Sequence, residues 1–267
     1  TFCVCARARS HSRHWRGRGG GASPGGPHTR ASKGAAIHSR AAMQPRLRVA
    51  SYNVLSPALA LLHLDPGHQA HRWEARRARL VESIVGLDAD VVAIQEYEFG
   101  DSLCRGVCAG MAAATGAPTR WLSTRRASTT RSDGPALCWR HDRLELVDWC
   151  RMVLGADVTP PPGVQTRGNV GLVAVFRVQK PAQGGSRGTR GSPRFVCVCT
   201  GHLLFNIKRG DTKLAQLWSL AAGITALRHR SKVSASACPA ILCGDFNSTP
   251  LSALYDACTS RTGSVDL

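Results

Sequence analysis

Apolar and polar residues alternate along several short stretches after residue 46, which is the pattern of a β-strand with one buried face. Residues 47–53 form the first such stretch, and residues 91–94 form a short, wholly apolar one. A continuous apolar run suits a strand that is covered on both faces. The same patterns predict five further strands, at 136–139, 144–149, 170–178, 194–200 and 240–243.

Two stretches show helical spacing instead. The first is marked by Trp73, Arg77, Leu80, Ile84 and Leu87. The second begins near Asp211 and is marked by Leu214, Leu217, Ala221, Ile224 and Leu227. Many strands with interspersed helices predict an α+β fold or a β-sandwich flanked by helices. The stretch 180–193, rich in Gly, Arg, Ser and Pro, is expected to be a long hairpin loop between two strands.

The first 45 residues lack this periodicity and are rich in Arg, Gly, Ser and Ala. Such a composition cannot bury enough apolar surface to offset the entropy of ordering, so we expect residues 1–45 to be disordered. Three origins remain open: an organelle transit peptide, an Arg- and Gly-rich RNA-binding tail, or an upstream extension of the gene model, since Met43 stands just before the first strand. The predicted domain is therefore 46–267.

Charge is concentrated in the same leading segment. The 267 residues include 35 Lys and Arg against 17 Asp and Glu, a formal charge of +18. Residues 1–48 hold ten of the basic residues and no acidic one, which leaves +8 for the remainder. The total is therefore weak evidence for a nucleic-acid partner. No uncharged apolar run approaches the roughly 20 residues of a membrane span, so no membrane partner is expected.

The 11 cysteines are odd in number, form no CxxC pair and follow no secretory signal. This pattern favours neither a disulfide framework nor a zinc site. Cys197 and Cys199 alternate along a predicted strand and should face one side as small buried hydrophobes. We therefore expect an intracellular protein, cytoplasmic unless the leader is a transit peptide to a mitochondrion or plastid.

Candidate chemistry lies where predicted strands end in polar side chains. The four segments are 51–53 (SYN), 94–96 (IQE), 200–203 (TGHL) and 241–248 (ILCGDFNS). Mg²⁺ prefers carboxylate and amide oxygens, which Glu96, Asn53, Asp245 and Asn247 carry. His202 can donate a hydrogen bond to a phosphate oxygen. Each segment alone is explained as a solvated strand end or a turn, but their joint occurrence favours a metal-assisted phosphate site.

Three of these segments resemble the leading motifs of the endonuclease/exonuclease/phosphatase family: 51–53, 90–96 and 244–248. The resemblance covers 46–267, and the branch of deadenylases, nocturnin and Angel proteins fits best. Features similar to that branch are Trp73 with Arg76, Asp133-Gly134, Asn169 to Leu172, and Tyr255 after Thr249-Pro250. The run 202–217 is similar to Angel proteins in particular.

The resemblance implies a deoxyribonuclease-I-like sandwich, with two packed sheets flanked by helices and the active site between them. It implies hydrolysis of phosphoesters with Mg²⁺, or Mn²⁺ in its place. Glu96 matches the principal metal ligand, and Asn53 matches an amide that supports the metal and the phosphate. His202 matches the phosphate-facing histidine, while Asp245 and Asn247 match the pair that orients water and phosphate. Asn169 and Asp133 match substrate-binding positions.

Two departures from the family pattern affect these expectations. Pro135 stands where the branch usually has Cys, beside the substrate position Asp133. The final Ser-Asp-His motif is absent, since the sequence stops at Asp266-Leu267. We therefore expect a fragment, or an incomplete gene model, of an active enzyme that lacks its last strands. The rival interpretation is a truncated, non-catalytic protein that binds RNA or another partner.

The expected function is that of a monomeric phosphoesterase domain acting on RNA 3′ ends. Its reaction is either 3′-exonucleolytic removal of poly(A) or hydrolysis of a 2′,3′-cyclic phosphate. A nocturnin-like 2′-phosphatase acting on a dinucleotide is the alternative, although the residues after His202 argue against it. A DNA-repair endonuclease is least favoured.

Overall fold

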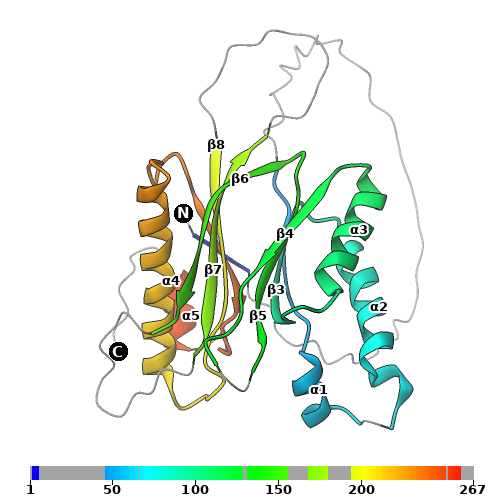
Figure 1. The fold of residues 1–267 in the computed structure, drawn as a ribbon. Helices are drawn as coiled ribbons and strands as arrows, with labels where there is room; N and C mark the ends of the chain where they lie inside the picture. The colour runs from blue at the N-terminus through cyan, green and yellow to red at the C-terminus, as the bar shows by residue number, and fades with distance from the viewer. Residues whose placement is uncertain are drawn as a thin grey trace, which may run out of the picture. The chain divides into compact units, whose positions relative to one another are not determined.

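The computed structural model describes residues 2–5, 46–65, 67–128, 131–155, 168–179, 194–250 and 252–259. Thr1–Arg7 and Leu47–Leu267 make up one compact unit, and Ala8–Arg46 make up another. The helices and strands belong to the first unit. Its elements, in chain order (Figure 1), are β1 (Phe2–Cys5), β2 (Val49–Asn53), α1 (Pro57–His63), a 3-10 turn (Gln69–His71), α2 (Trp73–Val85), β3 (Val91–Glu98), α3 (Leu103–Thr115), β4 (Thr119–Ser123), β5 (Asp133–Arg140), β6 (Leu144–Val153), β7 (Val170–Val178), β8 (Arg194–His202), α4 (Gly210–Arg230), β9 (Ala240–Asp245) and α5 (Ala253–Thr259).

The strands form two sheets. One has five strands in the order β1-β9-β8-β7-β6, and the other has four in the order β2-β3-β5-β4. Within them β2 runs parallel to β3 and β8 parallel to β9. Figure 1 shows the sheets packed face to face, with α4 outside the larger sheet and α2 and α3 outside the smaller one. The predicted fold class, two packed sheets flanked by helices, is confirmed.

Buried side chains explain why several strands read as continuous apolar runs. Along β3, Val91 and Ala93 enter the cluster between the two sheets. Their neighbours Val92 and Ile94 enter the cluster under α2 and α3. Successive side chains of a strand point to opposite faces, so a strand covered on both sides needs apolar residues at every position. In β7, Phe176 packs edge-on against Trp139 of the opposite sheet, with ring centroids 5.2 Å apart.

The predicted elements are present, and most are longer than expected. The apolar core of each strand was found from the pattern, but β3, β5, β6 and β9 continue into polar residues that carry the site or the surface. Helix α2, the first of the two predicted helices, ends at Val85 with Gly86 as its C-cap, and so ends before the predicted position Leu87. Among the elements that were not predicted are α1, α3, β4 and α5. α3 is rich in small residues, so its spacing of large apolar side chains gives no clear helical signal.

One strand lies in the segment that was expected to be disordered. β1 (Phe2–Cys5) pairs in parallel with β9, while the expectation of disorder for residues 1–45 as a whole stays a prediction. An edge strand exposes unpaired backbone groups, and a short β-prone segment can satisfy them. Residues 6–45 lie outside the described residues, as does the predicted loop 180–193. The strands that flank that loop, β7 and β8, pair antiparallel as expected.

Cys197 and Cys199 are buried in the cluster between the larger sheet and α4, as predicted, and both are free thiols.

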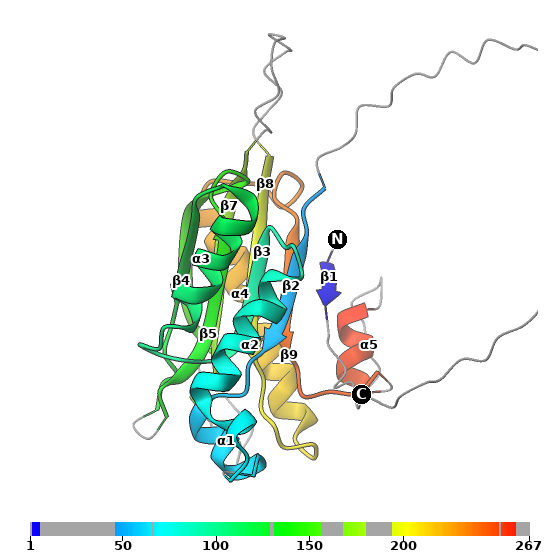
Figure 2. The ribbon, with the colours of Figure 1, turned by 90° about the vertical axis from the view of Figure 1, so that its right-hand side faces the viewer.

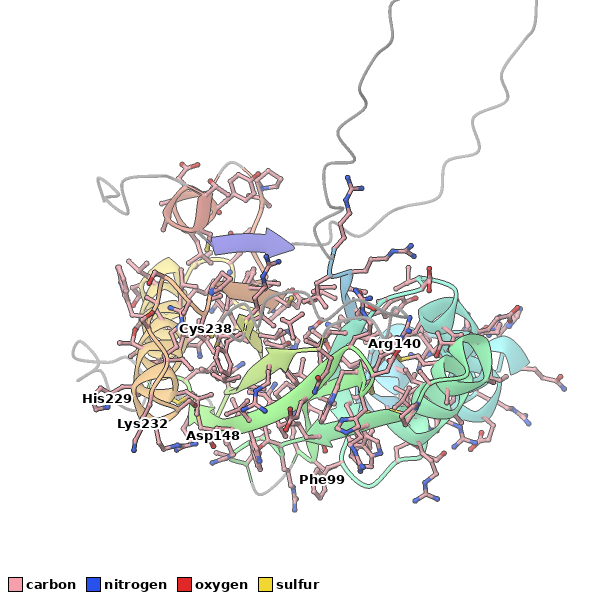
Figure 3. The ribbon with its side chains drawn as sticks, turned by 90° about the horizontal axis from the view of Figure 1, so that it is seen from above. Phe99, Arg140, Asp148, His229, Lys232 and Cys238 are labelled. Carbon is pink, nitrogen blue, oxygen red and sulfur yellow. The ribbon has the colours of Figure 1, made fainter. Side chains whose placement is uncertain are left out.

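At the C-terminal end of α4, Arg230 Nε donates to Asp148 Oδ2 at 2.6 Å and connects the helix to β6. Figure 3 shows Asp148 on β6, with His229 and Lys232 near that end of the helix. Among the helices of the described residues, none has the length and hydrophobicity to cross a membrane.

Candidate active site

The polar strand ends converge at one edge of the sandwich. Asn53 ends β2, His202 ends β8 and Asp245 ends β9, and the last two are paired across the parallel strands. Figure 2 shows β2 and β9, which belong to different sheets, side by side. Asn53 Nδ2 donates to Glu96 Oε1 and to Asp245 Oδ2, each at 2.8 Å. The structure therefore brings the four predicted segments together across the two sheets.

Glu96 is a buried carboxylate at a bulge of β3, where the register with β5 shifts between Ile94 and Tyr97. Its backbone has φ +59°, a left-handed value that a non-glycine residue rarely adopts. Oε2 accepts a hydrogen bond from the Ser56 N–H at 3.0 Å, and Ser56 also caps α1. Strain of this kind is retained where surrounding contacts hold it, and it clusters at functional sites.

His202 lies between the carboxylates and Asn247. Its Nε2 is 2.8 Å from Asn247 Nδ2, which also donates to Leu203 O at 2.9 Å. An amide NH₂ is only a donor, so Nε2 accepts and the proton of the neutral ring lies on Nδ1. Nδ1 is 3.6 Å from Glu96 Oε1, and no described residue forms a hydrogen bond with it. Burial lowers the pKa of His202, while Asp245 and Glu96 act in the opposite direction.

Asp245 and Asn247 form a compact turn after β9. The Asn247 N–H donates to Asp245 Oδ1 at 3.0 Å, so both oxygens of Asp245 accept hydrogen bonds in the site. Asn247 has φ +47°, in the left-handed region that Asn tolerates better than most residues. The turn thereby holds a carboxylate and a side-chain amide beside His202.

The two predicted substrate-binding residues take different positions. Asn169 Nδ2 donates to His202 O at 2.7 Å, and its buried Oδ1 has no hydrogen-bond partner among the described residues. Asp133 is buried and forms ion pairs with Arg126 Nη2 at 3.3 Å and Arg131 Nε at 2.8 Å. Asn169 therefore places a buried, unpaired side-chain oxygen near His202, while Asp133 forms ion pairs with two arginines.

Sequence reasoning missed three groups that shape the site. Arg126 acts electrostatically on His202, as does the predicted residue Asp133. Gln95 Nε2 donates to Thr200 Oγ1 at 3.0 Å and links the two sheets. Lys213 is buried and its Nζ donates to Asn247 O at 2.6 Å. Lys213 lies four residues before the apolar position Leu217 and therefore on the same face of the predicted helix. That spacing was the signal in the sequence that Lys213 would be buried.

The donors present fit a hard divalent cation. Glu96 and Asp245 direct carboxylate oxygens at one amide, that of Asn53, whose Oδ1 accepts from the Leu55 N–H at 2.9 Å. Within the described residues, no group of three or more His, Cys, Asp and Glu side chains could hold a metal. Mg²⁺ commonly uses one or two carboxylates and completes its shell with water and substrate phosphate. Glu96 and Asp245 supply that number of carboxylates.

A family model described as the endonuclease/exonuclease/phosphatase family matches residues 50–264. The chain belongs to this family. Membership confirms that the strand-end motifs resemble those of this family.

Angel proteins are among the relatives of this family member. Protein angel homolog 2 of Mus musculus is 32% identical over 220 residues, which cover 78% of this chain and 36% of the mouse protein. Protein angel of Drosophila melanogaster is 28% identical over 223 residues, which cover 82% of this chain and 57% of the fly protein. The chain thus spans about a third of the mouse relative and somewhat more than half of the fly relative, and the Angel branch is confirmed.

Solved structures agree with this assignment. ANGEL2, described as a 2′,3′-cyclic phosphatase and crystallised with adenosine-2′,3′-vanadate, is 30% identical with a TM-score of 0.61, over 79% of this chain and 56% of that one. The human Nocturnin catalytic domain with a bound sulfate anion has a TM-score of 0.58 at 20% identity, over 81% of this chain and 69% of that one. The second likeness concerns the fold alone.

Proposed function

We propose that this chain carries the catalytic centre of a Mg²⁺-dependent phosphoesterase that hydrolyses 2′,3′-cyclic phosphates at RNA 3′ ends. The observation that carries the proposal is the convergence of Glu96, Asp245 and His202 around Asn53 and Asn247. The hydrogen bond from Asn53 Nδ2 to Asp245 Oδ2 crosses from one sheet to the other. Carboxylates that hold a cation, and an imidazole N–H without a partner, suit stabilisation of a phosphate that gains negative charge.

Each residue has a chemical role in this reaction. Glu96 and Asp245 would hold Mg²⁺, which would supply the positive charge that polarises the phosphate and lowers the pKa of the attacking water. Asp245 and Asn247 orient that water opposite the leaving ribose oxygen. His202 donates from Nδ1 to a phosphate oxygen, and Asn169 offers Oδ1 to a substrate hydroxyl. The water oxygen bonds to phosphorus, one P–O bond to the ribose breaks, and the proton removed from water ends on the ribose oxygen.

The choice of substrate rests on similarity to ANGEL2, which is described as a 2′,3′-cyclic phosphatase. The competing substrates are poly(A) with a 3′-hydroxyl end and the 2′-phosphate of a dinucleotide such as NADP. All three need the same metal and histidine, so the centre alone does not separate them. Their comparison is therefore the test of substrate class.

The test uses the full chain and measures its hydrolysis of three substrates. They are an oligonucleotide with a 2′,3′-cyclic phosphate end, oligo(A) with a free 3′-hydroxyl, and NADP. With Mg²⁺ we expect the cyclic end to open to a monophosphate faster than the other two react, and EDTA to stop the reaction. Glu96→Gln removes the charge that holds the cation and should lower the rate by about 10³-fold.

Glu145→Gln is the matched control. Glu145 is a carboxylate of β6 that pairs with Arg177 at 3.0 Å. The substitution removes one negative charge from the surface and should leave the rate unchanged. Faster reaction on oligo(A) or NADP would replace the proposed substrate, and a wild-type chain inactive on all three would favour a non-catalytic binding module.

A further inference from the structure

Helix α4 begins beside the site and presents Lys213 to it from a buried position. Lys213 is only 4% exposed, and its Nζ donates to the main-chain oxygen of Asn247 at 2.6 Å. A buried ammonium without a polar partner is strongly unfavourable, so this contact compensates for the loss of water. Burial lowers the pKa of Lys213, and the nearby charge of Asp245 opposes that shift.

Asn247 connects this lysine to His202. The main-chain oxygen of Asn247 accepts a hydrogen bond from Lys213 Nζ, and its main-chain N–H donates to Asp245 Oδ1 at 3.0 Å. Its side-chain Nδ2 donates to His202 Nε2 at 2.8 Å. Asn247 has a left-handed φ of +47°, and in this conformation its main-chain oxygen and its side-chain amide reach different partners. Loss of the contact at the main-chain oxygen would therefore release the backbone of the residue whose side-chain amide lies beside His202.

A second residue of α4 holds the segment after β8 in a similar way. Gln216, one helical turn beyond Lys213, is fully buried, and its Oε1 accepts from the Leu204 N–H at 2.8 Å. The Leu203 N–H in turn donates to Asp245 O at 2.9 Å. The first turns of α4 thus hold both chain segments that leave the parallel strands β8 and β9.

We propose that Lys213 is a positioning residue for the reaction: its ammonium fixes the main chain of Asn247 so that the side-chain amide of Asn247 holds His202 in the orientation that presents Nδ1. The inference deepens the proposed function and rests on it for its kinetic consequence. Lys213 acts on His202 through Asn247. The effect of Lys213 on the position of these two side chains does not depend on the proposed function.

The kinetic test compares Lys213→Met with the wild-type chain on the cyclic-phosphate oligonucleotide. Methionine fills a similar volume without a donor, so kcat should fall about 100-fold, as expected when a reacting group is misplaced by about 1 Å, while KM changes less than about twofold. Lys213→Arg keeps a charged donor and should recover part of the loss. A rise in KM with kcat unchanged, or no change in either constant, would overturn the proposal.

Thr212→Val is the matched control, because Thr212 precedes Lys213 on α4, is equally buried at 4% exposure, and its Oγ1 has no hydrogen-bond partner among the described residues. This variant should keep wild-type kcat. If Lys213→Met does not fold, Lys213→Gln replaces it, since the shorter amide does not reach the Asn247 oxygen. An unchanged kcat in Lys213→Gln would then count against the proposal.

A second readout is independent of activity. In the ¹⁵N NMR spectrum, the side-chain NH₂ of Asn247 and the ring nitrogens of His202 should shift in Lys213→Met and stay in place in Thr212→Val. If the wild-type chain hydrolyses none of the substrates, the proposed function fails while these spectra still test the role of Lys213. Unshifted signals in Lys213→Met would refute that role.

Discussion

Asn53 illustrates how single side chains define this site. Glu96 and Asp245 would repel one another, and the Asn53 amide separates them by donating one hydrogen bond to each at 2.8 Å. Such charge-assisted bonds are stronger than neutral ones. Three left-handed non-glycine residues, at Leu55, Glu96 and Asn247, surround the same point. Local strain is therefore concentrated where the polar groups meet, which is where structures maintain it for function.

At the same scale, His202 gives the chain a pH-dependent stability. Burial lowers the pKa of His202 below its ordinary value of 6.5, so the unfolded chain binds this proton at a higher pH than the folded chain does. The free energy of unfolding should therefore be highest above pH 6.5 and fall as the pH decreases below it. We expect denaturant titrations in EDTA at pH 7.5, 6.5 and 5.5 to show this loss.

Two variants isolate the contribution of His202. His202→Gln removes the titrating ring, so its stability should fall less steeply between pH 7.5 and 5.5 than that of the wild-type chain. His229→Gln changes an exposed histidine near the end of α4 and should retain the wild-type slope. Equal slopes in all three proteins would show that His202 does not titrate in this range.

At the scale of elements, close packing of β8 against β9 sets the distance between His202 and Asp245. Gly244 pairs with Gly201 in the parallel register. A Cβ added at Gly244 would lie 2.3 Å from Gly201 O, and Gly244 has φ +149°. Gly244→Ala should therefore strain the backbone and lower the free energy of unfolding by about 2–3 kcal/mol. Chemical denaturation measures this difference.

Gly210→Ala provides the comparison for that substitution. Gly210 opens α4, and an added Cβ would meet nothing within 4 Å. Alanine also favours the helix more than glycine does, so this variant should be as stable as the wild-type chain or slightly more stable. If Gly244→Ala were equally harmless, the close approach of the two strands would not constrain the site.

The elements also show how far the sequence predicts the site. The residues at the ends of β2, β3, β8 and β9 were predicted because an apolar run followed by Asn, Glu, His or Asp is visible in one dimension. Arg126 and Lys213 were not, because their roles depend on contacts with Asp133 and Asn247 that only the folded chain makes. Local patterns therefore identified the polar side chains that the structure brings together, and missed the residues whose contacts with them form only in the folded chain.

For the whole molecule, the apolar cluster between the sheets joins the two halves of the site. Residues of both sheets, including Leu137, Leu172 and Phe176, are fully buried in it. Glu96 and Asn53 lie on one sheet and His202 and Asp245 on the other. The site therefore exists only while the sheets stay packed, and we expect the sandwich to unfold as one cooperative unit.

Buried cysteines on both sides of the sandwich report this cooperativity. Cys104 and Cys108 of α3 and Cys138 of β5 lie in the cluster between the smaller sheet and its helices, whereas Cys197, Cys199 and Cys238 lie in the cluster between the larger sheet and α4. Burial raises the pKa of Cys197 to about 12, and thiols react as thiolates, so the native chain should resist iodoacetamide at pH 8 at these positions. In increasing guanidinium chloride, both groups should become reactive with the same midpoint, as measured by peptide mass spectrometry. Because the two groups lie on opposite sides of the sandwich, separate midpoints would mean that one side opens before the other and that the cluster between the sheets does not unite the fold.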